Sequence, residues 1–249
     1  MTRDEPSILL VDDDVDICSN LADILGDLSY RVDVAHDGHA ALELIRRNRY
    51  DVAVLDYKMP GMNGATLARE IRRLRPELVS LLVTAHVGTA GDEALSAGAW
   101  QILAKPVDTR RLLGLVDQAL DQPLVLVVDD DRDLCANLWD LLRERGYRVG
   151  LAHDGGEAAR RLIEARFHVV LIDIRLPDGD GSDVFHLVCE ANPGARTMLI
   201  TGNSPGAGEL LERILAEGAD AVCYKPFDVP VLLDSLERLT AYRPGGEPR

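Results

Sequence analysis

The feature that most restricts the fold of this chain is an internal repeat. Sliding the 249-residue sequence against itself by 117 residues places YRVDVAHDG at 30–38 on YRVGLAHDG at 147–155. The same offset places VAVLDYKMPGMNG at 52–64 on VVLIDIRLPDGDG at 169–181. A period of this length indicates a duplicated domain rather than a solenoid. We therefore expect two domains of one fold, each able to bury a core of its own.

Within each copy, short runs rich in Val, Ile and Leu alternate with amphipathic stretches. This alternation predicts βα units that feed a parallel sheet. In copy one we expect strands near 8–12, 31–35, 51–56, 78–83 and 100–104. The helices of copy one are expected near 15–28, 38–48, 64–74, 88–97 and 108–121. In copy two we expect strands near 124–129, 148–152, 168–173, 195–200 and 220–224.

The helix expected at 15–28 contains apolar residues at steps of three and four. That spacing predicts a buried stripe on one face of the helix, formed by Ile17, Leu21, Ile24 and Leu28. The join between the two copies is short. We expect domains at 7–121 and 124–241, followed by a disordered tail at 242–249.

Charge and hydropathy exclude several functions. The chain has 42 acidic and 27 basic residues, a net charge of −15, and no basic run interleaved with aromatic residues, so we expect no nucleic-acid partner. No apolar stretch approaches the roughly 20 residues that span a bilayer. We therefore expect a cytoplasmic protein with no membrane partner. The four cysteines lack a CxxC spacing, which favours reduced thiols, and the matched Cys18 and Cys135 are expected in the cores.

Acidic residues gather where the predicted strands end. LLVDDDVD at 9–16 places three carboxylates directly after a buried strand, LVVDDDRD at 126–133 repeats this, and Asp56 ends the third strand. Neighbouring carboxylates repel unless a cation or a donor offsets their charge. Ligands bind beyond the carboxyl ends of parallel strands. If the first and third strands are neighbours, Asp12, Asp13 and Asp56 therefore converge on a hard divalent cation such as Mg²⁺.

Two further residues fit phosphoryl transfer. Thr84 ends the fourth strand, and Lys105 ends the fifth in an AKP sequence that recurs as YKP at 224–226. Only three of the 27 basic residues are lysines, so a compact ammonium is indicated at these places. With Mg²⁺ bound, Asp56 could attack a phosphoryl donor as the nucleophile. Lys105 and Thr84 would then contact the phosphoryl oxygens.

In this order along the chain, the residues resemble the motifs of response regulator receiver domains. The resemblance rests on an acid pair after strand one, an Asp followed four residues later by Pro and soon by Gly, a Thr after the fourth strand and Lys-Pro after the fifth. Both copies carry the whole set, and together they cover nearly the whole chain. The resemblance implies an α/β fold of two tandem flavodoxin-like (βα)5 doubly wound domains. Each would have a parallel five-stranded sheet of order 2-1-3-4-5.

The resemblance also implies the role of each site residue. In copy one, Asp13, Asp56 and the carbonyl of Lys58 would ligate Mg²⁺, Asp12 would act more through water, and Asp56 would be the phosphoacceptor. The matching residues of copy two are Asp129, Asp130, Asp173, Arg175, Thr201 and Lys225. Many receivers carry an aromatic switch residue three positions before the lysine. Here those positions hold Ile102 and Val222, so any switch must work through backbone or aliphatic repacking.

Several nearby residues have simpler interpretations. Asp14 and Asp131 are predicted to be helix N-caps. His36 and His153 lie in matching AHDG turns, where a structural or solvated role is favoured over phosphotransfer. Gly64 is assigned mainly to turn formation.

The expected function is that of a two-component response regulator with two receiver domains. Each would accept a phosphoryl group from a sensor histidine kinase or a phosphotransfer protein, with output through protein contacts. Apart from this self-catalysed phosphorylation and dephosphorylation, the chain is not expected to be an enzyme. The alternatives are a receiver-fold scaffold that is never phosphorylated and the receiver portion of a longer hybrid kinase or regulator. A haloacid dehalogenase type of hydrolase is disfavoured because Asp56 and Asp173 lack the second acid of a DxD motif.

Overall fold

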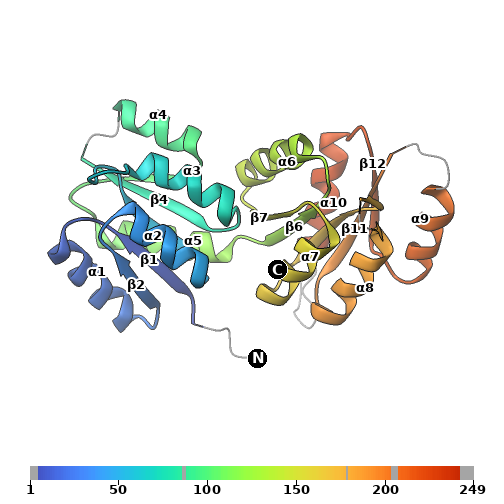
Figure 1. The fold of residues 1–249 in the computed structure, drawn as a ribbon, viewed down its shortest axis with the longest axis horizontal. Coiled ribbons are helices and arrows are strands. Elements are labelled where there is room, and N and C mark those ends of the chain that lie inside the picture. Colours follow the sequence, from blue (N-terminus) through green and yellow to red (C-terminus); the bar gives the residue numbers. More distant parts are fainter. Residues whose placement is uncertain (1–4, 86–87, 178, 203–206, 242–249) are drawn as a thin grey trace. The chain divides into compact units, whose positions relative to one another are not determined.

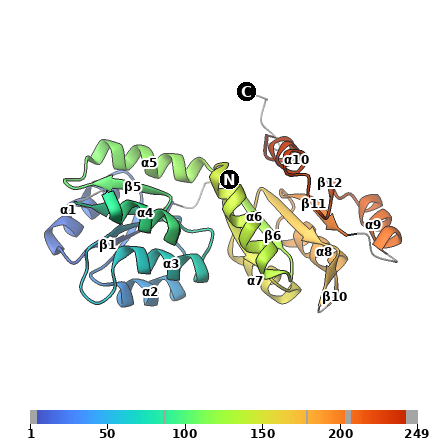
Figure 2. The same ribbon diagram turned by 90° about the horizontal axis from the view of Figure 1, so that it is seen from above.

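The computed structural model describes residues 5–85, 88–177, 179–202 and 207–241. The chain divides into two compact units between Gln122 and Pro123. In each unit a sheet is covered by helices on both faces (Figures 1 and 2). The tail predicted at 242–249 lies outside the described residues.

The first unit is built on a parallel sheet of strand order β2-β1-β3-β4-β5. Its strands are β1 (Ser7–Val11), β2 (Arg31–Ala35), β3 (Val52–Asp56), β4 (Val79–Thr84) and β5 (Gln101–Ala104). Its helices are α1 (Val15–Asp27), α2 (Gly38–Arg47), α3 (Gly64–Leu74), α4 (Gly88–Ala97) and α5 (Thr109–Asp121). Strands β1, β3 and β4 are buried along their whole length, because helices cover both faces of the sheet.

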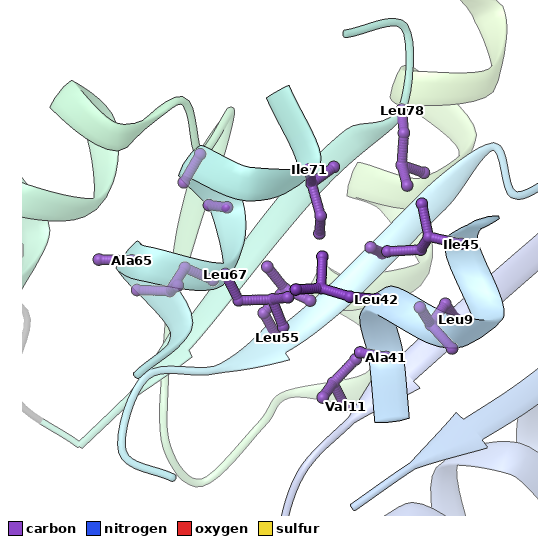
Figure 3. Packing of buried hydrophobic residues seen from close by; sticks show 14 of the residues in the cluster. Leu9, Val11, Ala41, Leu42, Ile45, Leu55, Ala65, Leu67, Ile71 and Leu78 are labelled. Carbon is purple, nitrogen blue, oxygen red and sulfur yellow. The ribbon is translucent and has the colours of Figure 1, made fainter. Parts of the chain in front are cut away.

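Two apolar clusters hold this unit together. On one face of the sheet, α2, α3 and α4 pack over alternate strand residues such as Leu9 and Leu55, with Leu42, Ile45 and Ile71 supplied by the helices (Figure 3). On the other face, α1 and α5 cover the remaining residues of the same strands. The strand ends, where polar residues follow, are therefore carried by a rigid sheet.

The second unit repeats this arrangement, with strand order β7-β6-β8-β11-β12. Its main strands are β6 (Leu124–Val128), β7 (Arg148–Ala152), β8 (Val169–Asp173), β11 (Arg196–Thr201) and β12 (Ala221–Tyr224). Its helices are α6 (Arg132–Glu144), α7 (Gly155–Glu164), α8 (Gly181–Ala191), α9 (Ala207–Ala216) and α10 (Val229–Ala241). Helices α7, α8 and α9 cover one face of the sheet, and α6 and α10 cover the other.

The predicted fold class and strand order are confirmed in both units. Cys18 and Cys135 are buried free thiols, as expected for core positions. The structure adds one element that the sequence pattern did not indicate: a short antiparallel pair of β9 (Arg175–Leu176) and β10 (Gly179–Asp180). Two residues per strand are too few to show a periodicity. In the described part of the chain, no helix is both long and apolar enough to cross a bilayer.

The predicted buried stripe of α1 is wrong in its second half. Ile17 and Leu21 are partly buried, but Ile24 and Leu28 are 38% and 52% exposed. The helix buries Cys18 and Leu25 instead. The buried face includes Cys18 and the partly buried Ala22 beside Leu25, so it is rotated relative to the prediction. A hydrophobicity pattern gives most weight to large side chains and therefore placed the stripe too far toward Ile24 and Leu28.

The fourth helices of the two units are expected to differ in local stability. Helix α4 has the sequence GTAGDEALSA, and its counterpart α9 has AGELLERILA, which contains better helix formers. We predict that the amide hydrogens of α4 exchange faster than those of α9, measured by hydrogen exchange and mass spectrometry of peptides from the intact chain. Equal or reversed protection would contradict this prediction.

Candidate functional site

The carboxyl ends of β1 and β3 bring three acids of the first unit together. The two strands are paired with Val11 beside Leu55, so Asp12 and Asp56 extend from neighbouring strands. Asp12 and Asp56 are buried, and Asp13 is exposed. One carboxylate oxygen from each of the three acids lies within 4.8 Å of the others. Carboxylates this close raise the cost of ionising one another unless positive charge lies among them.

Lys105 supplies positive charge at this cluster. It follows β5, and its Nζ atom lies 2.8 Å from Asp12 Oδ2 and 2.9 Å from Asp56 Oδ1. Burial disfavours the charged ammonium, but the bonds to Asp12 and Asp56 outweigh burial and raise the pKa of Lys105. The lysine therefore stays charged at neutral pH and bridges two of the three acids.

Burial raises the pKa of Asp56. The bond from Lys105 opposes this shift, and the charges of Asp12 and Asp13 add to it. The carboxylate that is proposed below to react is thus held in an environment that disfavours its charge. A further cation at this place would lower the cost of ionising it.

The side chains form one open cleft of about 470 Å³. Besides the three acids and Lys105, it is lined by Asp14, Lys58, Thr84 and Ala85. Thr84 ends β4, one residue beyond the pair formed by Asp56 and Val83. All six site residues predicted for copy one therefore line the same cleft. Their individual roles stay predictions.

The loop after β1 is held by its own acids. The Asp14 side chain accepts hydrogen bonds from the backbone N–H groups of Asp16 and Ile17, which confirms it as the N-cap of α1. Asp12 Oδ1 accepts a hydrogen bond from the N–H of Asp14 at 2.9 Å. Asp14 thus caps α1, while Asp12 and Asp13 contribute oxygens to the acid cluster.

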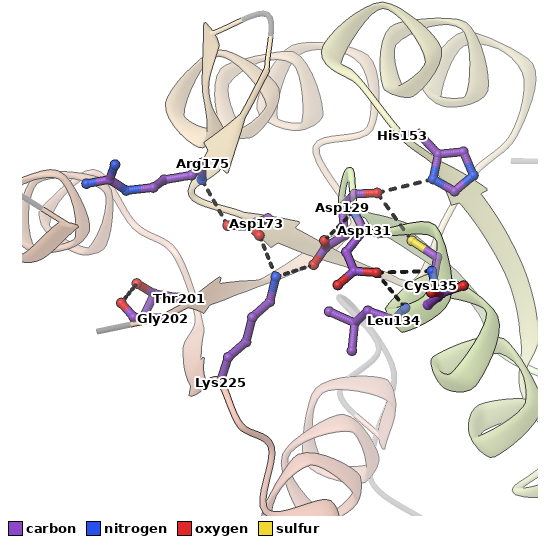
Figure 4. Close-up of polar contacts among 11 residues, drawn as sticks. Asp129, Asp131, Leu134, Cys135, His153, Asp173, Arg175, Thr201, Gly202 and Lys225 are labelled. Atoms are coloured by element: carbon purple, nitrogen blue, oxygen red, sulfur yellow. Dashed lines mark hydrogen bonds and ion pairs between the residues drawn. The ribbon is translucent and has the colours of Figure 1, made fainter. Parts of the chain in front are cut away.

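The second unit repeats the cluster. Single carboxylate oxygens of Asp129, Asp130 and Asp173 lie within 4.8 Å of one another. Lys225 Nζ lies 2.7 Å from Asp129 Oδ2 and 2.6 Å from Asp173 Oδ2 (Figure 4). Asp131 accepts hydrogen bonds from two N–H groups at the start of α6 and is its N-cap, as predicted.

The other two residues predicted for copy two lie at the adjoining strand ends. The N–H of Arg175 donates to Asp173 Oδ1 at 2.9 Å, while its guanidinium points away from the acids (Figure 4). Thr201 ends β11, one residue beyond the pair formed by Ile200 and Asp173. Its hydroxyl donates to the carbonyl of Gly202 at 3.2 Å.

The donor atoms of the second unit fit a divalent cation. Asp129 is completely buried, and the partner of its Oδ2 atom is the Lys225 ammonium at 2.7 Å, which also contacts Asp173. Burial raises the pKa of Asp129, although Lys225 opposes the shift. One ammonium shared among three clustered carboxylates leaves negative charge that a further cation would offset. Clustered carboxylate oxygens are the ligands that Mg²⁺ prefers, so the residues present fit this ion.

The response regulator receiver domain family matches residues 8–117 and 125–237. This chain belongs to that family. The match takes in both units and both acid clusters. It supports tandem receiver domains with an acidic site in each, a type of domain that generally receives its phosphoryl group from a histidine kinase.

Some relatives match nearly all of this receiver protein, and others match about half of it. A response regulator receiver protein of an Anaeromyxobacter species is 36% identical over 235 residues, which cover 93% of this chain and 94% of that protein. The transcriptional regulatory protein ZraR of Escherichia coli is 38% identical over 122 residues, which cover 48% of this chain and 27% of ZraR. A solved receiver domain of Methanospirillum hungatei is 32% identical, with a TM-score of 0.46, covering 47% of this chain and 95% of that one.

Sequence reasoning missed the role of one glycine in each receiver domain. A Cβ atom on Gly64 would lie 2.4 Å from the carbonyl oxygen of Asp56, and one on Gly181 would lie 2.6 Å from that of Asp173. Both glycines are the first residues of their helices, so α3 and α8 start in direct contact with the backbone of the acid. The signal was present in the sequence as a matched glycine eight residues after each acid. The sequence interpretation assigns Gly64 mainly to turn formation and gives Gly181 no role.

We predict that Gly64→Ala disturbs the first site. The added methyl group meets backbone and must displace α3 or the end of β3, so the first domain should lose about 1–3 kcal/mol of stability. Differential scanning calorimetry measures this loss. Gly114→Ala in α5 is the matched control: nothing lies within 4 Å of its Cβ position, and it should be neutral or slightly stabilising. Equal thermal stability of Gly64→Ala and the unsubstituted protein would contradict the prediction.

We also predict that Asp56→Asn stabilises the metal-free protein at neutral pH. A carboxyl group whose pKa is raised by folding contributes stability below its unfolded pKa of about 3.9 and loses that contribution as the pH rises through the folded pKa. The ionised Asp56 therefore opposes folding at pH 7. The stability that Asp56→Asn gains over the unsubstituted protein should shrink as the pH falls toward about 4.

Thermal unfolding in a chelator measures this effect, with the exposed Asp23→Asn as the control for loss of one negative charge. Mg²⁺ should stabilise the unsubstituted protein more than Asp56→Asn, since the variant lacks one carboxylate of the acid cluster. If Asp56→Asn unfolds at a lower temperature than the unsubstituted protein at pH 7 without metal, the ionised Asp56 does not oppose folding and the prediction is wrong.

Proposed function

We propose that each receiver domain accepts a phosphoryl group on an aspartate, Asp56 in domain 7–121 and Asp173 in domain 124–241. The donor would be a phosphohistidine on a cytoplasmic sensor histidine kinase or phosphotransfer protein. One observation carries this proposal. In both domains a lysine ammonium lies 2.6–2.9 Å from the first acid of the cluster and from the proposed nucleophile.

The acids of each cluster would hold Mg²⁺. The direct ligands would be Asp13, Asp56 and the Lys58 carbonyl in the first domain, and Asp130, Asp173 and the Arg175 carbonyl in the second. Asp12 and Asp129 would act through a water molecule. When bound, Mg²⁺ supplies positive charge that draws the phosphoryl oxygens toward the carboxylate.

The protein's own residues would perform the transfer. A carboxylate oxygen of Asp56 attacks the phosphorus, the P–O bond forms as the P–N bond to the donor imidazole breaks, and the imidazole leaves with the electron pair. The Lys105 ammonium is already at the cleft and neutralises a phosphoryl oxygen, and the Thr84 hydroxyl is at the adjoining strand end to donate to another. Asp173, Lys225 and Thr201 would act in the same way in the second domain.

We propose that the protein passes on its signal through protein–protein contacts. The two matched segments occupy most of the chain, and both are receiver domains. A change of charge at the strand ends on phosphorylation would alter the adjoining loops and helices. This is the usual route by which a local charge change reaches a binding surface.

We predict that the protein takes up two phosphoryl groups from a small acyl phosphate in the presence of Mg²⁺. Intact mass spectrometry should show one group fewer in Asp56→Asn, one fewer in Asp173→Asn and none in the double variant. Asp108→Asn keeps a good N-cap on α5 and should still take up two. A scaffold that is never phosphorylated would show no mass gain at all. Unchanged uptake in the double variant would show that other residues are modified.

A further inference from the structure

One carbonyl group in each domain accepts hydrogen bonds from two side chains. In the first domain, the backbone oxygen of Asp12 lies 3.4 Å from Cys18 Sγ and 3.2 Å from His36 Nδ1. Cys18 belongs to the first turns of α1, and His36 follows β2, so the two side chains come from different elements. They meet on the residue that precedes the exposed acid Asp13.

The second domain repeats both contacts. The backbone oxygen of Asp129 lies 3.3 Å from Cys135 Sγ and 3.2 Å from His153 Nδ1, and both are drawn in Figure 4. The segments that carry these residues are closely similar in the two copies, as YRVDVAHDG at 30–38 and YRVGLAHDG at 147–155 show. Both domains keep the same pair of side chains on the carbonyl of the first acid.

These contacts complete the hydrogen bonding of Asp12. Its N–H donates to the carbonyl of Ala35 at the end of β2, its Oδ1 accepts from the N–H of Asp14, and its Oδ2 accepts from Lys105. The carbonyl oxygen is the remaining acceptor, and Cys18 and His36 occupy it. The backbone and the carboxylate of Asp12 are therefore both fixed by named partners.

Holding this carbonyl also orients the next residue. The peptide group that joins Asp12 to Asp13 is planar, so fixing its oxygen fixes the direction of the bond to the Cα atom of Asp13. Asp13 is exposed and belongs to the acid cluster of the cleft. Cys18 and His36 do not line the cleft themselves, yet they hold the peptide plane from which Asp13 extends.

Both donors carry a proton in this arrangement. A carbonyl oxygen can only accept, so the neutral ring of His36 must hold its proton on Nδ1. Burial raises the pKa of the Cys18 thiol to about 11, with the charge of Asp12 adding to the shift. For the same reason, burial raises the pKa of Cys135 to about 12. Each thiol therefore remains an S–H donor at neutral pH.

We propose that His36 with Cys18, and His153 with Cys135, are positioning residues for the acid pair that binds Mg²⁺. They act through the backbone carbonyl of the first acid and hold the second acid in its binding orientation. The inference rests on the proposed function, because it assigns Mg²⁺ to these clusters. Groups of this kind around ligands commonly control metal affinity.

The test separates the Nδ1 donor from the rest of the ring. In His36→Asn, the side-chain amide nitrogen takes the place of Nδ1, whereas in His36→Gln it takes the place of Nε2. The Mg²⁺ dissociation constant of each site is measured by NMR titration of backbone amides, so the second domain of the same molecule serves as the control. We expect His36→Gln to weaken binding at the first site by about three- to tenfold, the effect of about one hydrogen bond, and His36→Asn to change it by less than about twofold.

Equal affinity of the Gln and Asn variants at the first site would overturn the proposal, as would a loss that appears equally in both domains. The buried partner is tested in the same way. Cys18→Ala removes the donor and should weaken Mg²⁺ binding, and Cys18→Ser keeps a hydroxyl donor and should restore most of it. If both Cys18 variants instead bind Mg²⁺ like the unsubstituted protein, the thiol has no positioning role.

A metal-free measurement keeps the two proposals apart. The ¹⁵N shifts of the His36 ring in a chelator, at a pH where the ring is neutral, should show the proton on Nδ1. A proton on Nε2 instead would overturn the positioning role, whether or not the protein binds Mg²⁺. If the unsubstituted protein binds Mg²⁺ but takes up no phosphoryl group, the proposed function fails and the positioning role is still decided by the variants. Absence of Mg²⁺ binding in the unsubstituted protein would overturn both.

Discussion

Repulsion among carboxylates at the ends of neighbouring parallel strands is the constraint on which each domain depends, and one lysine offsets it. Asp12 and Asp56 are buried and ionisable, and they face the same cleft. Lys105 reaches them from the edge strand β5, across β4, with a single ammonium that contacts both. A long flexible stem ending in a compact charge suits this reach, which explains a lysine here in a chain that otherwise uses arginine.

The backbone around the acids is fixed as closely as their charges. The first residue of the third helix in each domain lies against the carbonyl of the proposed phosphoacceptor, where only glycine has room. The carbonyl of Asp12 accepts from two side chains, and its N–H continues the sheet. A cluster of like charges is therefore held by many short-range contacts, each of modest strength. Such a rigid frame is what a metal or phosphoryl site requires, because its ligands must keep their positions when charge changes.

The two domains share this centre but connect it differently to their fourth helices. In the first, the hydroxyl of Tyr57, next to Asp56, donates to Glu93 of α4 at 2.9 Å. The matching residue of the second domain is the buried Ile174, which cannot make this bond. There, Arg213 of α9 donates to the hydroxyl of Ser182 at the start of α8. The fourth helix of each domain is thus held to its neighbouring elements through different side chains.

The sequence by itself determined the duplication, the α/β fold class, the strand order implied by the family motifs, and which acids and lysines lie at the strand ends. The duplication follows from comparing the sequence with itself, and the strand order is what the family resemblance implies. The fold class and the strand-end residues follow from spacing along single strands and helices, because a polar residue after a buried strand has only one edge of the sheet to occupy. Only the tertiary structure decided which face of α1 is buried, that Gly64 touches the backbone of Asp56, and that Cys18 and His36 meet on one carbonyl. Those contacts join segments whose separation in sequence has no period, so they depend on how closely helices and loops pack on the sheet.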